Sequence, residues 1–153
     1  MKNVLLCIAA GLLLAHCGGN SAPVIVEPKL SDIEQKIFKP SCALSTACHQ
    51  SARASTGNMN LSAGASFAQI VGVAVDNPAA GAAGKKRVVA GSPDQSFLVQ
   101  KILGTGLSLC TDDRTPSPRL CNEGFRMPDQ SPQLPQQHID AIRTWITNGA
   151  LNN

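Results

Sequence analysis

The chain has 153 residues and a formal net charge of +3, and aromatic residues make up only 3% of it. This length predicts one domain, and the small charge without a long basic run gives no support to a nucleic-acid partner. Four phenylalanines, one tryptophan and no tyrosine make a thin core. A small domain of this kind usually needs disulfides or a bound cofactor for stability.

The N-terminus is typical of a secretory signal. Lys2 precedes an apolar run over residues 4–14, which is too short to span a bilayer comfortably. The end of this run and the cysteine after it, residues 14–17, resemble a bacterial lipobox, although His16 replaces the small residue expected there. We therefore expect a lipoprotein-type signal peptide over residues 1–16, a lipid anchor at Cys17 and a tether over residues 17–30. An ordinary cleaved signal, which would leave Cys17 as a spare thiol, is the alternative.

Export decides the surroundings of the mature chain. Gly18 after the lipidated cysteine gives no obvious inner-membrane retention signal, so we expect an anchor in the outer membrane, facing the periplasm or the cell surface. The periplasm is oxidising, and its thiols are paired, modified or metal-bound. With Cys7 in the signal and Cys17 lipidated, the cysteines that remain are Cys42, Cys48, Cys110 and Cys121.

These four cysteines allow three connectivities, and the sequence does not choose among them. A disulfide between Cys110 and Cys121 is the default for the second pair. Closing that loop would contribute about 2–3 kcal/mol in the chain-entropy model. We therefore expect a domain held together by one or two disulfides.

Helical patterns separated by long loops, with almost no strand signal, predict an all-α fold. Ser31 and Glu34 form a capping-box pattern, so the first helix is expected to begin at Ser31 and to stop at Pro40. A short helix is expected near Ser66. Residues 76–87, which are rich in Gly and Ala, are expected to form a flexible exposed loop.

Two further helices are predicted in the second half of the chain. Ser92 followed by Pro93 is a typical helix start, and Gly104 is a typical end. The last helix is expected to begin near Pro135 and to end at Gly149. Its apolar residues at helical spacing are Ile139, Ile142, Ile146 and Ala150, with Trp145 beside them.

The segment from Cys42 to His49 carries the strongest chemical signal in the chain. Two cysteines followed at once by a histidine is the order that attaches a haem, because the thiols can add to the haem vinyl groups and the imidazole can reach the iron. The usual spacing is C-x-x-C-H, whereas Cys42 and Cys48 enclose five residues. Such a spacer must bulge outward to bring both sulfurs to the haem.

A haem held noncovalently or by a single thioether is an alternative, and two haemless fates are open to the same residues. A disulfide between Cys42 and Cys48 needs Cα atoms within about 7 Å, which a loop of this length easily allows. A zinc site made from Cys48, His49 and the cysteines at 110 and 121 lacks the paired C-x-x-C spacing. A haemless protein with the Cys42–Cys48 disulfide would serve as a structural or binding module.

Several stretches in fixed order carry a family resemblance. They are residues 37–42, 48–49, 57–61, 89–93 with 96–98, 127–128, and 139–146 with 149–150. Together they cover residues 31–150, and the order of Cys-His, Met-Pro and a terminal helix ending Trp-Ile-x-x-Gly-Ala resembles a small class I c-type cytochrome domain. The chain is similar in particular to the cytochrome-like domains of exported proteins in planctomycetes and myxobacteria.

The resemblance implies a role for each matching residue. Cys42 and Cys48 would form thioethers to one haem c, His49 would be the proximal iron ligand and Met127 the distal one. A His/Met pair raises the reduction potential of the iron. With both axial positions filled, the protein would be an electron carrier and not an enzyme. It would be a monomer that exchanges electrons with redox proteins in the periplasm. Its last helix would pack against its first helix.

Other residues have simpler interpretations. Met59 is the second candidate for the distal ligand, although its place close to the attachment segment favours a loop or core role. A lone methionine is more often filler than ligand, which also applies to Met127. His138 is expected to face solvent from the polar side of the last helix. The chain has no Gly-x-Ser-x-Gly motif and no phosphate loop, so hydrolytic catalysis is disfavoured.

Overall fold

The computed structural model describes residues 24–107 and 123–153. Its helices are connected by long irregular segments, and the strand-like pairing in the described residues consists of isolated bridges such as that between Val71 and Val88. The all-α class is therefore confirmed. The elements are α1 (Leu30–Ile33), η1 (Glu34–Cys42), η2 (Ala54–Thr56), α2 (Ser66–Ile70), α3 (Pro78–Ala82), η3 (Pro93–Gln95), α4 (Phe97–Leu103) and α5 (Gln136–Thr147).

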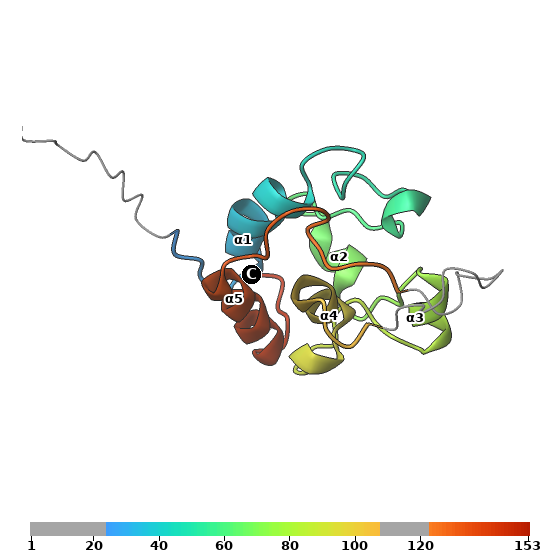
Figure 1. The fold of residues 1–153 in the computed structure, drawn as a ribbon. Coiled ribbons are helices and arrows are strands. Elements are labelled where there is room, and N and C mark those ends of the chain that lie inside the picture. Colours follow the sequence, from blue (N-terminus) through green and yellow to red (C-terminus); the bar gives the residue numbers. More distant parts are fainter. Residues whose placement is uncertain (1–23, 108–122) are drawn as a thin grey trace, which may run out of the picture.

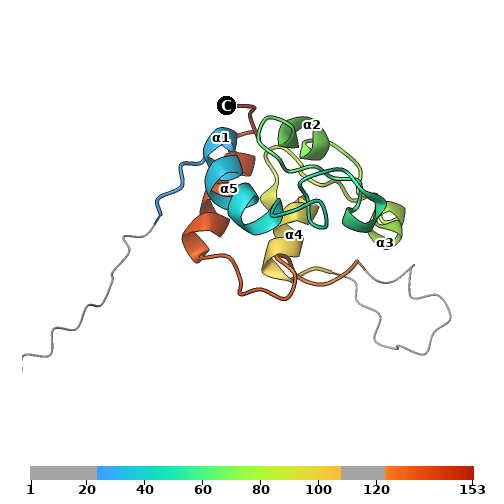
Figure 2. The same cartoon turned by 90° about the horizontal axis from the view of Figure 1, so that it is seen from above.

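The helices lie in a row. Figures 1 and 2 show α1 and α5 side by side at one end, α2 and α4 in the middle and α3 at the other end. The segment 123–135 leads back from the α3 end to α5, across α4 (Figure 1). None of the helices in the described residues is long and apolar enough to cross a membrane.

The core forms where α5 packs on the first helices, as the sequence predicts. Ile142, Trp145 and Ile146 are buried in one cluster with Ile33 and Ile37. The helical spacing of the apolar α5 residues places them on one face of the helix, and packing this face against the first helices removes it from water. α5 ends at Thr147, and Gly149 follows with a positive φ of 97°, so the predicted end of this helix is also confirmed.

The predicted capping box at the first helix is wrong. The backbone N–H groups of Leu30 and Ser31 donate to Asn153, to its side-chain oxygen at 3.0 Å and its carbonyl at 2.9 Å. The last residue of the chain thus supplies the acceptors that a capping box would give. Glu34, only 7% exposed, instead accepts from the Gly64 N–H at 3.0 Å and the Ser66 hydroxyl at 2.6 Å. Its carboxylate ties the first helix to the start of α2.

The predicted stop at Pro40 is also wrong. The helix widens into π-type turns from Glu34 and runs through Pro40 to Cys42. Ala43 N–H then closes the last wide turn on the carbonyl of Phe38 at 2.7 Å. Pro40 lacks an N–H, but in these turns the neighbouring residues carry the hydrogen bonds. As a consequence, Cys42 is the last residue of η1.

Residues 76–87 are not the expected open loop, because they contain α3. The side-chain oxygen of Asn77 accepts from the N–H groups of Ala79 and Ala80, both at 3.0 Å, and Pro78 takes the first helical position. Asn before Pro is a recognised helix start, which the Gly and Ala content of this stretch concealed. α2 begins at Ser66 as predicted. The helix expected at Ser92 is a 3-10 turn, η3, followed by α4, which ends at Gly104.

Candidate functional site

The five residues between Cys42 and Cys48 form a closed loop. The carbonyl of Ser45 accepts from Cys48 N–H at 3.0 Å, and the carbonyl of Cys42 accepts from His49 N–H at 3.0 Å. The loop therefore returns the chain to the helix end from which it left. Leu44, 63% exposed, lies at the outside of this loop. The longer spacer is accommodated as an outward bulge, while the backbone of His49 stays attached to that of Cys42.

The imidazole of His49 is oriented by a backbone carbonyl. Its Nδ1 lies 3.4 Å from the carbonyl oxygen of Met59, and the N–H of Leu61 donates to the His49 carbonyl at 2.7 Å. A carbonyl can only accept, so we assign the ring proton to Nδ1. This leaves Nε2 with its lone pair free. A histidine that ligates a metal usually has such a partner on its other nitrogen.

The surroundings of His49 keep its ring neutral. Burial lowers the pKa of His49, and the positive charges of Arg87 and Lys101 lower it further, against the contact with the Met59 carbonyl, which raises it. A neutral imidazole is the form that binds a metal ion. The site therefore combines the orientation and the protonation state that an axial ligand needs.

Cys42 and Cys48 are free thiols, and both are half-buried. The two sulfur atoms are not joined in this structure, and the alternative disulfide for this pair stays a prediction. Burial raises the pKa of Cys42 to about 12, and the nearby Cys48 adds to this shift. The Ser45 hydroxyl lies 3.7 Å from the Cys48 sulfur. The two free thiols therefore lie at the two ends of the same closed loop.

The raised pKa predicts low reactivity at Cys42. The thiolate is the reacting form, and with a pKa of about 12 only about one Cys42 in 10⁴ would be a thiolate at pH 8. We expect iodoacetamide to alkylate Cys42 in the folded haem-free protein on the order of a thousandfold more slowly than in urea. Mass spectrometry of peptides at timed intervals measures this ratio. Equal rates in the two states would show that Cys42 is not buried in solution.

The two methionines occupy different surroundings. Met59 packs against the main core, and its carbonyl faces His49, so its contribution to the site is a backbone oxygen. Met127 is half-buried. It lies outside α4 but is bonded to it, because its N–H donates to the carbonyl of Lys101 in α4 at 2.8 Å. Its role as an iron ligand stays a prediction.

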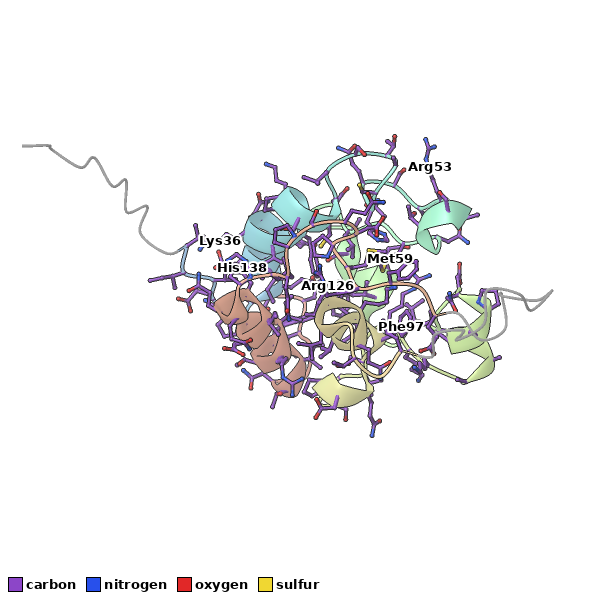
Figure 3. All side chains as sticks on the ribbon, in the orientation of Figure 1. Lys36, Arg53, Met59, Phe97, Arg126 and His138 are labelled. Atoms are coloured by element: carbon purple, nitrogen blue, oxygen red, sulfur yellow. The ribbon has the colours of Figure 1, made fainter. Side chains whose placement is uncertain are left out.

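His138 does not face solvent, so that expectation is wrong. Both of its ring nitrogens are buried, and neither has a hydrogen-bond partner in the described part of the chain. The helical repeat explains this, since His138 lies four residues before Ile142 and seven before Trp145, on the buried stripe of α5. Figure 3 shows His138 at the α1–α5 end, well separated from Met59 in that view.

The remaining site predictions find less support. Cys17, Cys110 and Cys121 lie outside the described residues, so the lipid anchor and the second disulfide stay predictions. No group of three or more His, Cys, Asp or Glu side chains that could hold a metal ion occurs within residues 24–107 and 123–153. A cleft beside α4, bordered by Lys85, Lys86 and Gln100 among others, does not include the Cys42–His49 segment.

Comparison with known proteins adds no relative. No protein-family model, no curated protein and no solved structure matches the chain.

Proposed function

We propose that the chain is an exported, lipid-anchored electron carrier that binds one c-type haem. The observation that carries the proposal is the geometry of His49. Its Nδ1 faces the Met59 carbonyl, its Nε2 has no hydrogen-bond partner among the described residues, and its backbone N–H donates to Cys42 in the loop that also holds Cys48. This donor set fits a haem, since it offers two free thiols and one neutral, oriented imidazole.

Each residue would have a defined task in the haem-bound protein. Cys42 and Cys48 would hold the haem edge as thioethers, and His49 would bind the iron through Nε2 while the Met59 carbonyl fixes the ring. Met127 would supply the second axial ligand. The haem supplies a one-electron Fe(III)/Fe(II) couple when bound, and a soft thioether opposite histidine favours the ferrous state.

A test of the proposal uses mature protein made in bacteria that carry a c-type haem assembly pathway. We expect a mass equal to the chain plus one haem, resistance of that mass to acid and acetone extraction, and a sharp α-band on reduction. A protein with no Soret band and with the mass of the bare chain would overturn the proposal.

One observation favours a second candidate, a haemless structural or binding module with a Cys42–Cys48 disulfide. The hydrogen bond from His49 N–H to the Cys42 carbonyl, at 3.0 Å, brings the chain at Cys48 back to Cys42. In an oxidising compartment, nearby thiols become disulfides unless they are modified or bound to metal. Under this candidate, the mature protein would weigh two protons less for this pair, and reduction would restore two alkylatable thiols.

A further inference from the structure

A lysine on α4 holds both ends of the segment that leads to Met127. The Lys101 ammonium donates to the carbonyl of Glu123 at 3.2 Å and to that of Phe125. The Lys101 carbonyl accepts from the Met127 N–H at 2.8 Å. One residue thus binds the backbone of residues 123–127 at three points, through its side chain and through its main chain.

A second lysine, Lys85, also binds this segment, through Glu123. The Lys85 ammonium lies 2.7 Å from the carboxylate of Glu123, whose side chain is 1% exposed, and it also donates to Gln100 and to the Gly106 carbonyl. The Lys85 and Lys101 ammonium groups lie 5.6 and 5.9 Å from the centre of the Phe97 ring. Both are within the range of a cation–π contact.

Two glycines show how closely this segment fits. A Cβ atom on Gly124 would lie 3.0 Å from the Lys101 nitrogen, and one on Gly104 would lie 3.1 to 3.3 Å from the Arg126 side chain. Both glycines have positive φ values, 79° and 71°, which other residues rarely adopt. A side chain at either position would therefore strain the backbone and push aside the side chain of Lys101 or Arg126.

We propose that Lys101 is a positioning residue of the haem site, which fixes Met127 in place and supplies a positive charge that favours ferrous iron. The proposal rests on the proposed function and names a residue that the haem-attachment pattern does not contain. The first part follows from the three bonds to residues 123–127. The second follows from electrostatics, since reduction removes one positive charge from the iron and a nearby cation favours the less positive state.

The surroundings of Lys101 support the second part. Burial lowers the pKa of Lys101, while the negative charges of Glu123 and Asp129 raise it. Lys101 is half-buried and its carbonyl bonds to the N–H of Met127, the proposed distal ligand, so its charge would act on the iron, because a charge away from bulk water is screened less.

The test compares three variants of the haem-bound protein. Lys101→Met removes the ammonium and keeps the apolar stem, Lys101→Arg keeps the charge, and Lys36→Met removes a lysine that pairs at the surface with Asp32. We expect Lys101→Met to lower the equilibrium constant for reduction about tenfold, which is 59 mV for one electron, and to weaken the red sulfur-to-iron absorption band. Lys101→Arg should retain both properties, and Lys36→Met should change neither.

Hydrogen exchange at the Met127 amide tests the positioning without using the haem. We expect this amide to exchange at least about tenfold faster in Lys101→Met than in Lys36→Met, with thermal melting as a check that both variants fold. Unchanged exchange together with an unchanged potential would overturn the proposal for Lys101. A protein that carries no haem would overturn the proposed function, and the exchange result would still decide whether Lys101 positions Met127.

Discussion

Replacing His49 with alanine is expected to remove the low-spin haem spectrum that the proposed function predicts. The substitution takes away the imidazole whose Nε2 is free and whose Nδ1 faces the Met59 carbonyl at 3.4 Å, so the iron would keep only Met127 as a protein ligand. Losing even the outer partner of a metal-bound histidine costs about 10–100-fold in metal affinity or activity. We therefore expect the yield of low-spin haem per chain to fall about 100-fold or more. The absorption spectrum of the purified reduced protein measures this yield.

His138→Ala is the matched control for this prediction. His138 and His49 are the two histidines that follow the proposed signal peptide, and His138, whose ring nitrogens are buried, lies at the α1–α5 end of the molecule (Figure 3). His138→Ala should retain the low-spin spectrum, although it leaves a gap in the buried stripe of α5. The reverse pattern, a spectrum that survives His49→Ala and is lost in His138→Ala, would show that the ligands are wrongly assigned.

The sequence predicts the helices that depend on local signals. α5 is foreseeable because its apolar residues recur at helical spacing and Gly149 follows them. α2 and the end of α4 at Gly104 are foreseeable for similar reasons. These elements need only the residues within a turn or two, and that information is local.

The errors arise where a distant part of the chain takes over a local role. Asn153 accepts the first hydrogen bonds of α1, which frees Glu34 to bond to Gly64 and Ser66, about thirty residues away. No local pattern around Ser31 indicates that the other end of the chain will arrive there. The wrong prediction for His138 is a different case, because the local sequence contains the answer. His138 lies four residues before Ile142 and seven before Trp145, which places it on the buried face of α5.

The candidate site also combines features that the sequence shows with features that depend on the fold. The order of Cys42, Cys48 and His49 is visible in the sequence, and so is the problem of the five-residue spacer. The path of the spacer, a loop closed by the hydrogen bond from His49 N–H to the Cys42 carbonyl, becomes visible only in the fold. The same holds for Met59, which the sequence marks as a second ligand candidate and whose carbonyl instead orients His49.

The largest change in stability is expected for Trp145→Ala. Trp145 is 1% exposed in the core between α5 and the first helices, and its Nε1–H donates to the Leu151 carbonyl at 2.8 Å. Truncating a buried tryptophan to alanine removes its transfer free energy and leaves a cavity, which costs about 3–5 kcal/mol. Since domains have about 5–15 kcal/mol of stability in total, much of the protein should unfold at moderate urea concentrations. Urea unfolding followed by far-ultraviolet circular dichroism gives the free energy of unfolding.

Two further variants separate the causes of this loss. Trp145→Phe keeps an aromatic ring in the core but removes the hydrogen bond to Leu151, which is worth about 1 kcal/mol, so its cost should be clearly smaller than that of Trp145→Ala. Thr144→Ala changes the adjacent, exposed residue of α5 and should stay within about 0.5 kcal/mol of the unaltered protein. If Trp145→Ala costs no more than Thr144→Ala, the terminal helix does not pack on the first helix in solution. The segment that carries Met127 leads directly into α5. If the low-spin haem spectrum were kept without this packing, something else would have to hold the proposed ligand Met127 in place, and the contacts of Lys101 with residues 123–127 are the candidates.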